Sequence, residues 1–181
     1  IDDLLMYSKV SSVNQGDFIV TDIAQLIRDA CEEIDDQILS KKAVINVGEI
    51  AAIKTIPALM RQVFINLISN SLKYSKESDI PVVKISASIT PLPSIFSSGA
   101  KGNFMRISVE DNGIGFPEAS RSRLFDPFFR LHTKEEYEGT GIGLALCKKI
   151  MDLHSGYITC TGETGKGSEF DLYLPILTNK N

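Results

Sequence analysis

Apolar residues recur at every third or fourth position along several stretches of the chain, which is the spacing of an amphipathic helix. This period predicts helices over residues 1–9, 22–40, 57–74, 118–124 and 140–154. The helix over 57–74 begins with a proline, which suits the first turn of a helix.

Runs of β-branched and aromatic residues between these helices predict short strands. The predicted strands are residues 18–20, 44–47, 51–55, 82–89, 104–109, 157–161 and 169–174. The stretch 90–103 is rich in Pro, Ser and Gly, which predicts a loop. Because strands, hairpins and helices mix along the chain, we expect an α+β fold. It should be a two-layer sandwich in which helices cover one face of a mixed, mostly antiparallel sheet.

The composition is that of one globular domain. Of the 181 residues, 43% are hydrophobic and 23% are charged, which leaves no room for a disordered chain. The net charge of −4 argues against a surface that holds nucleic acid or anionic lipid, so we expect no nucleic-acid partner. The cysteines Cys31, Cys147 and Cys160 form no C-x-x-C pair, which argues against a zinc site or a disulfide framework and favours reduced thiols.

The beginning of the chain suggests a segment of a longer protein. There is no initiator methionine, and residues 1–10 read as the tail of a helix already under way. Acids stand near the start where a signal peptide would carry positive charge, and no apolar run reaches the roughly eighteen residues of a membrane span. We expect a cytoplasmic domain, whose full-length protein can still be membrane-anchored.

A stripe of polar side chains follows one face of the helix predicted over 57–74. Gln62, Asn66, Asn70 and Lys73 are spaced by four, four and three residues, which stacks them on one side. A buried polar stripe is costly unless it meets a polar ligand or water. The alternative interpretation is a solvated outer face.

Two glycine-rich segments are candidates for ligand contacts. Asp111 comes directly off a predicted strand and is followed by Gly113 and Gly115, an arrangement that also occurs in plain turns. Residues 139–144 (Gly-Thr-Gly-Ile-Gly-Leu) open a predicted helix, whose first backbone amides can bind phosphate oxygens. The residues before 139 form no strand, so the dinucleotide-binding fingerprint does not fit.

Five segments resemble, in order and at ordinary spacing, the N, G1, F, G2 and G3 boxes of the ATP-binding catalytic domain of sensor histidine kinases. These segments are residues 57–74, 111–115, 125–130, 139–144 and 165–170. The resemblance implies the Bergerat nucleotide-binding fold, which the family shares with DNA gyrase B and MutL. It also implies three parts: a dimerisation-helix tail and linker (1–15), the ATP-binding catalytic domain (16–177) and a C-terminal tail (178–181).

The resemblance implies roles for the residues of the N box and for the first residue of the G1 box. Asn70 would bind the Mg²⁺ that bridges the phosphates of ATP, and Asn66 would support it from one turn earlier. Lys73 would meet phosphate, and Tyr74 would pack on the adenine or the ribose. Asp111 would accept the exocyclic amino group of adenine, a contact that distinguishes ATP from GTP.

The resemblance also implies an ATP lid after the G1 box. Gly113 and Gly115 would bend the chain into this lid, and the two phenylalanines Phe128 and Phe129 would anchor it by packing. Arg130 would reach the γ-phosphate and act in catalysis together with the N-box residues. The remaining implied contacts are Lys134 from the lid, Thr140, Gly141, Gly143 and Leu144 at the phosphates, and Ser168 at the base through water. For Arg130 and Lys134 the alternative is an exposed, solvated charge.

One position bears on the reaction. In the ATP-hydrolysing members of the superfamily, a glutamate four residues before the magnesium asparagine activates water as a general base. Here that position is Asn66, whose amide cannot take a proton. Phosphoryl transfer to a protein acceptor is therefore favoured over hydrolysis. Two alternatives stay open: an ATP-hydrolysing protein of the superfamily, and a nucleotide sensor without catalysis.

The phosphoacceptor histidine is expected outside this chain. The sequence holds two histidines, His132 in the lid and His154 at the end of a predicted helix, and neither sits in the family's phosphoacceptor pattern. Residues 1–9 resemble the end of the second dimerisation helix, so the acceptor is expected upstream of Ile1. The full-length protein is then expected to be a homodimer that serves a response regulator, and this fragment a monomer.

Overall fold

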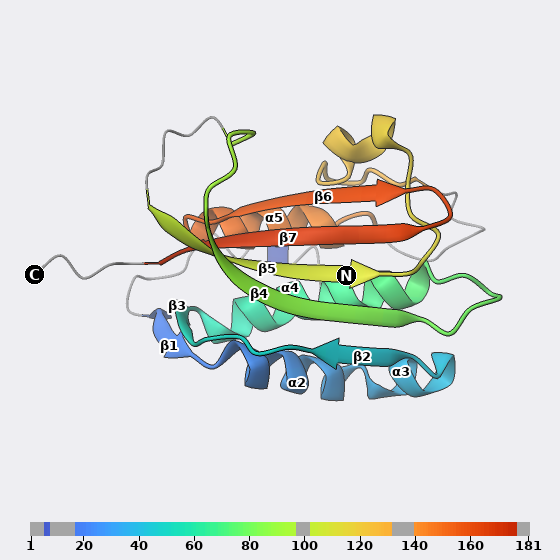
Figure 1. Cartoon of the computed structure of the whole chain (residues 1–181), viewed down its shortest axis with the longest axis horizontal. Coiled ribbons are helices and arrows are strands. Elements are labelled where there is room, and N and C mark those ends of the chain that lie inside the picture. The colour runs from blue at the N-terminus through green and yellow to red at the C-terminus, as the bar shows by residue number, and fades with distance from the viewer. Residues whose placement is uncertain (1–5, 8–16, 97–101, 132–139, 177–181) are drawn as a thin grey trace, which may run out of the picture.

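The computed structural model describes residues 6–7, 17–96, 102–131 and 140–176 (Figure 1). In chain order the elements are β1 (Ile19–Thr21), α2 (Ile23–Glu33), α3 (Asp35–Lys41), β2 (Val44–Val47), β3 (Ile53–Thr55), α4 (Pro57–Lys73), β4 (Val82–Pro91), β5 (Asn103–Asp111), the 3-10 helix η3 (Glu118–Arg123), α5 (Gly143–Leu153), β6 (Tyr157–Glu163) and β7 (Gly167–Pro175).

The main sheet has five strands in the order β2-β4-β5-β7-β6. The pair β2–β4 is parallel, and the other three pairs are antiparallel. Figure 1 shows α4 and α5 behind this sheet and α2 beside α4. The predicted two-layer α+β sandwich, with a mixed, mostly antiparallel sheet and helices on one face, is therefore confirmed.

Helix α4 is the centre of the core. Val63, Phe64 and Leu67 are fully buried on it, between α2, α5 and the sheet. Met60 and Ile68 are also fully buried, so apolar side chains surround most of the helix. Because full burial of each such side chain contributes on the order of 2 kcal/mol, α4 is held firmly, and the polar side chains at its end have a fixed place.

The helix predicted over 22–40 is interrupted at Ile34. The backbone of Ile34 has φ −115° and ψ 22°, and its N–H donates to the carbonyl of Cys31 at 3.2 Å instead of to a residue four positions back. This tight turn keeps the Ile34 side chain in the core at 6% exposure, whereas α3, which follows, has no buried residue. The predicted helix is therefore two helices, α2 and α3, which meet at Ile34.

The strands predicted on either side of Gly48 belong to two different sheets. Gly48 N–H donates to the carbonyl of Ile85 at 2.8 Å, which is the last bond between this segment and β4. The chain then leaves the main sheet, and β3 pairs with β1 in an antiparallel ribbon. Local periodicity predicts a strand but not its partner, so the sequence did not distinguish these cases.

The loop predicted over 90–103 is shorter than expected, because β4 extends to Pro91 and β5 begins at Asn103. Within its described part, the ring of Phe96 lies 4.8 Å from that of Tyr157 and 5.6 Å from that of Tyr173, measured between centroids. The loop therefore packs onto the end of the sheet opposite to Asp111.

Some predicted helices and site residues lie wholly or partly outside the described residues. Other predicted helices differ in the structure in their type or their first residue. Of the helix predicted over 1–9, only Met6 and Tyr7 are described, and both are helical. His132, Lys134, Gly139 and the tail 178–181 are not described. Residues 118–123 form a 3-10 helix, and the helix predicted from Thr140 begins at Gly143. Among the described helices, none is both long and apolar enough to cross a membrane.

Candidate nucleotide-binding site

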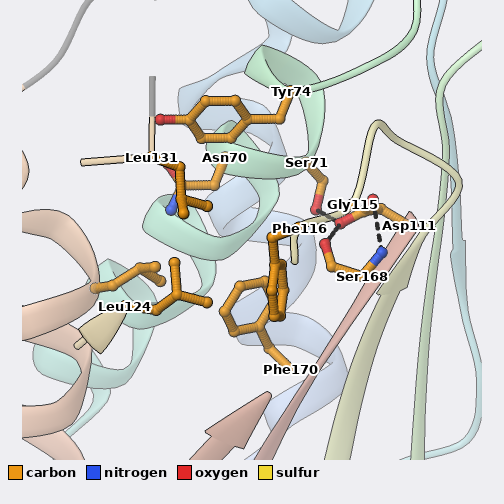
Figure 2. A pocket seen from close by; sticks show the side chains of 11 residues that line it. Asn70, Ser71, Tyr74, Asp111, Gly115, Phe116, Leu124, Leu131, Ser168 and Phe170 are labelled. Carbon is orange, nitrogen blue, oxygen red and sulfur yellow. Dashed lines mark hydrogen bonds between the residues drawn. The ribbon is translucent and has the colours of Figure 1, made fainter. Parts of the chain in front are cut away.

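The carboxylate of Asp111 lies at the end of β5 and is almost completely buried. Its Oδ1 accepts hydrogen bonds from the backbone N–H of Gly113 at 2.8 Å and of Ser168 at 3.3 Å. Its Oδ2 accepts from the hydroxyls of Ser168 at 2.6 Å and of Ser71 at 3.2 Å (Figure 2). Four donors from three segments thus fix the carboxylate, and all four suit an ionised acceptor.

The turn after Asp111 depends on two glycines. Gly115 has a φ of +63°, and a Cβ at this position would overlap the carbonyl oxygen of Glu163. A Cβ at Gly113 would come within 2.5 Å of the carbonyl oxygen of Tyr74, to which the N–H of Ile114 donates at 2.9 Å. The turn is therefore packed between the end of α4 and the β6–β7 hairpin.

A mostly apolar cavity extends from Asp111 (Figure 2). The hydroxyls of Ser71 and Ser168 stand beside the carboxylate at its polar end. The rest is lined by the apolar side chains of Phe116, Leu124, Leu131, Leu144 and Phe170. Such a pocket suits a planar base with an exocyclic amino group, because the faces of the base contact apolar side chains while the amino group donates to the carboxylate.

A more polar cavity adjoins the first. Both are lined by Asn70, Tyr74, Leu124, Leu131 and Leu144, so together they form one continuous cleft. The second alone is lined by Asn66, Ser69, Lys73, Phe129, Arg130, Thr140, Gly141 and Gly143. The cleft thus runs from a carboxylate at its apolar end to two cationic side chains at its polar end.

The N-terminus of α5 lies at the polar end of the cleft, where Gly143 and Leu144 line it. The first backbone N–H groups of a helix have no partner within the helix, and its dipole favours an anion at this end. Gly141, just before the helix, has a φ of +72°, and a Cβ there would come within 3.0 Å of the backbone of Phe128. Glycine is required for this close approach, which brings two segments of the chain together at the cleft.

Asn66 connects α4 to α5. Its Nδ2 donates to the carbonyl of Gly143 at 3.2 Å, and its Oδ1 accepts from Nε2 of Gln62 at 3.1 Å. Both polar atoms of the amide therefore have protein partners. This arrangement holds the start of α5 against the face of α4 that also carries Asn70.

Lys73 and Tyr74 end α4 at the cleft. The Nζ of Lys73 lies 4.6 Å from the centroid of the Tyr74 ring, a cation–π distance. Tyr74 lines both halves of the cleft, and Lys73 lines the polar half. The ammonium group is thus placed where anionic oxygens would lie if a base occupied the apolar half.

A family model described as "Histidine kinase-, DNA gyrase B-, and HSP90-like ATPase" matches residues 55–178. The chain belongs to this family. Within the family it is the catalytic ATP-binding domain of a sensor histidine kinase.

Curated relatives of this kinase domain are much longer than the chain. The phytochrome-like protein Cph1 of Synechocystis is 35% identical over 176 residues, which cover 97% of this chain and 22% of that protein. The sensor histidine kinase RcsC of Escherichia coli is 34% identical over 122 residues, or 66% of this chain and 11% of that protein. The chain thus spans about a fifth or less of these relatives.

Solved structures share the fold of the kinase domain. Full-length ShkA, crystallised with AMPPNP, superposes with a TM-score of 0.76 over 98% of this chain and 35% of that chain, at 24% identity. The nucleotide-free catalytic domain of histidine kinase ThkA superposes with a TM-score of 0.68 over 87% of this chain and 95% of that chain, at 25% identity.

The fold brings nearly all of the residues singled out in the sequence to one cleft. Those that line it are Asn66, Asn70, Lys73, Tyr74, Asp111, Gly115, Arg130, Thr140, Gly141, Gly143, Leu144 and Ser168. The backbone N–H of Gly113 donates to the Asp111 carboxylate, but Gly113 does not line the cleft. Lys134 lies outside the described residues.

The expectation that both phenylalanines of the F box anchor the lid is wrong for Phe128. The Phe128 side chain is 67% exposed, whereas Phe129 is half-buried and its ring lies 4.4 Å from the Arg123 guanidinium. Only the backbone of Phe128 is tied down, because its N–H donates to the carbonyl of Gly141 at 2.9 Å. The turn conformation at Phe128 directs its side chain away from the core.

Sequence reasoning missed Ser71 and the apolar lining residues Phe116, Leu124, Leu131 and Phe170. Ser71 is 4% exposed on a helix face that is otherwise apolar. A buried hydroxyl on such a face requires a hydrogen-bond partner, and a serine on an apolar helix face could therefore have indicated a polar contact at Ser71. Its partner, Asp111, lies 40 residues away in the sequence, so only the fold reveals it.

Proposed function

We propose that this kinase domain binds ATP with Mg²⁺ and transfers the γ-phosphate to a histidine on a dimerisation domain upstream of residue 1 in the full-length protein. The observation that supports this most directly is the continuous cleft between the buried Asp111 carboxylate and the N-terminus of α5. One end suits adenine and the other suits phosphates, which are the two ends of ATP.

The protein side chains act mainly by holding the nucleotide. Asp111 accepts the amino group of adenine, which GTP cannot offer at that position, and Tyr74 packs beside the base or the ribose. The amides of Gly143 and Leu144 and the ammonium of Lys73 receive phosphate oxygens. Arg130 reaches the γ-phosphate from the lid side, where it stabilises the charge of the transferring group.

Asn70 is the proposed protein ligand for Mg²⁺. Within the described residues, no three His, Cys, Asp or Glu side chains are grouped as a metal cage. The single side-chain oxygen of Asn70 fits Mg²⁺, because this ion keeps several waters and is otherwise bound by phosphate oxygens and one or two protein oxygens. When bound, the ion neutralises charge on the β- and γ-phosphates.

The amide side chain of Asn66 favours phosphoryl transfer to a protein acceptor over hydrolysis of ATP. Its amide cannot act as a general base for water, and both of its polar atoms already have partners in the protein. We assign it as a positioning residue that keeps α5 and its phosphate-binding turn against α4. With no group at this position to activate water, the P–O bond breaks as the acceptor imidazole forms the P–N bond and ADP leaves.

The acceptor is proposed to come from elsewhere, because neither His132 nor His154 sits in the family's phosphoacceptor pattern and the structure makes His154 unsuitable. Its ring is 5% exposed, and each ring nitrogen is within hydrogen-bond distance of a backbone group. A dimerisation domain that carries the acceptor, and a response regulator that takes the phosphate onward, are the partners proposed for the full-length protein. Since both ATP and such regulators are cytoplasmic, the domain is placed there.

The test is incubation with radiolabelled Mg-ATP, with and without the dimerisation domain supplied in trans. We expect ATP binding by calorimetry, no label on this chain alone, and acid-labile label on the acceptor. Asn70→Ala should abolish transfer, whereas Asn103→Ala, an exposed asparagine at the far end of β5, should not. Steady release of phosphate without an acceptor would instead support the hydrolase alternative.

A further inference from the structure

Strand β6 carries a glycine beside the apolar half of the cleft. Gly162 is paired with Ser168 of β7, whose hydroxyl donates to the Asp111 carboxylate at 2.6 Å. Directly paired residues of antiparallel strands face the same side of a sheet, so a side chain at Gly162 would point to the side of the cleft. Gly162 has no positive φ, unlike Gly165 and Gly167 in the same hairpin. Its backbone conformation therefore does not require glycine.

The space beside Gly162 is filled by the ring of Phe116. A Cβ at Gly162 would lie 2.6 Å from Cε1 of this ring and 2.8 Å from its Cδ1 and Cζ. Carbon atoms in ordinary contact lie about 3.5–4.0 Å apart, so a side chain and the ring cannot share this space. Phe116 is buried and lines the apolar half of the cleft (Figure 2). The missing side chain of Gly162 thus decides how far the ring lies from the centre of the cavity.

The backbone segments on the two sides of this contact are held together. The N–H of Gly165 donates to the carbonyl of Ile114 at 2.7 Å, which ties the β6–β7 hairpin to the turn that carries Phe116. The neighbouring Gly115 packs so closely that a Cβ there would overlap the carbonyl oxygen of Glu163. A methyl group on the strand would therefore displace the ring and not the backbone. The open space next to the ring is the cavity that the ring lines.

We propose that Gly162 is a positioning residue for the base of ATP, because it leaves room for the Phe116 ring and so sets the width of the apolar half of the cleft. This inference rests on the proposed function, which makes the base the occupant of that half. In the free domain, a displaced ring enters the cavity at little cost. When nucleotide binds, the ring and the base compete for the same space. The cost of overpacking therefore appears as a loss of affinity for ATP.

The test measures ATP binding by calorimetry in a double-mutant cycle of Gly162→Ala and Phe116→Leu. Gly162→Ala alone should weaken ATP binding about tenfold to a hundredfold, the range that overpacking typically produces. With Phe116→Leu in the background, whose side chain is smaller, the same change should cost only a small part of this. The KM for ATP should rise in the same order. The rate of transfer to a supplied dimerisation domain at saturating Mg-ATP should change little, because the polar half of the cleft is unaltered.

The matched control is Thr161→Ala, because Thr161 is exposed on the same strand and, by alternation along β6, faces the other side of the sheet. It should leave the affinity for ATP unchanged. An unchanged affinity in Gly162→Ala, an equal loss in Thr161→Ala, or an equal loss with and without Phe116→Leu would overturn the role of Gly162. Loss of folding in Gly162→Ala, measured by thermal denaturation, would overturn it unless Phe116→Leu restores both folding and ATP binding. If wild type itself binds no ATP, the proposed function fails before any variant is compared, and this inference fails with it.

Discussion

Nε2 of His154 accepts a hydrogen bond from the backbone N–H of Ile56 at 3.0 Å, which joins the end of α5 to the start of α4. Nδ1 lies 2.8 Å from the carbonyl oxygen of Ile150, so Nδ1 carries the proton and the ring is neutral. The ring of Phe18 packs against it in an edge-on arrangement at 5.0 Å. One neutral imidazole thus connects the two helices that flank the polar end of the cleft.

Stability should depend on pH through this ring. Burial lowers the pKa of His154 below its ordinary value of 6.5. The unfolded chain therefore binds the proton more readily, and the free energy of unfolding should fall as the pH drops below about 6.5 toward the lowered pKa. Urea denaturation between about pH 8 and about pH 5 measures this. The His154→Gln variant should have a lower free energy of unfolding at neutral pH than wild type, and its free energy of unfolding should lack the fall near pH 6.5 that the imidazole causes. An identical pH profile in wild type and variant would show that the His154 ring does not cause this fall.

Asp111→Asn should lose adenine recognition while the domain stays folded. The amide replaces one acceptor oxygen with a donor, which then faces N–H or O–H donors of Gly113, Ser168 or Ser71. Loss of a hydrogen bond to a charged group costs about 1.5–3 kcal/mol, so the affinity for ATP should fall about tenfold to a hundredfold. Calorimetry with ATP and GTP tests this, with the exposed Asp152→Asn on α5 as the control. An unchanged ATP affinity would show that Asp111 does not bind the base.

Ser71→Ala should weaken ATP binding by a smaller amount. The Ser71 hydroxyl has one proton, shared between Asp111 Oδ2 at 3.2 Å and the carbonyl of Leu67 at 3.1 Å. Its contribution of about 1 kcal/mol corresponds to roughly a fivefold loss of affinity. Ser75→Ala is the matched control, because Ser75 is also buried near the end of α4, but its hydroxyl accepts from Lys41. Equal losses in both variants would show a general effect on the helix.

Gly115→Ala should be far more damaging to stability than Gly165→Ala. Both glycines have positive φ, so each substitution incurs roughly 1–2 kcal/mol of left-handed strain. Only at Gly115 does the added Cβ overlap backbone atoms, those of Glu163 and Gly167, whereas at Gly165 nothing lies within 4 Å. Thermal denaturation with and without ATP compares them. Similar melting temperatures would mean that the turn can move away from the β6–β7 hairpin.

Local patterning predicted much of the fold because helices and strands are themselves local. The apolar period of α4 and its proline at the first turn match a helix at Pro57–Lys73, and the glycines of the G2 segment precede α5 as expected. The ordered boxes also indicated most of the residues that line the cleft, since each box is a short motif. Positions within one helix or turn need no knowledge of the rest of the chain.

Partners distant in the sequence could not be predicted in this way. The separation of β2 from β3, the burial of Ser71 against Asp111 and the bond between His154 and Ile56 each depend on where another element packs. The exposure of Phe128 likewise depends on a turn that its own residue type disfavours. The sequence by itself thus determined most of the helices and strands, the family, and which kinds of side chain line the cleft. Only the tertiary structure decided which side chains meet, because buried polar groups find partners wherever the packed core brings them.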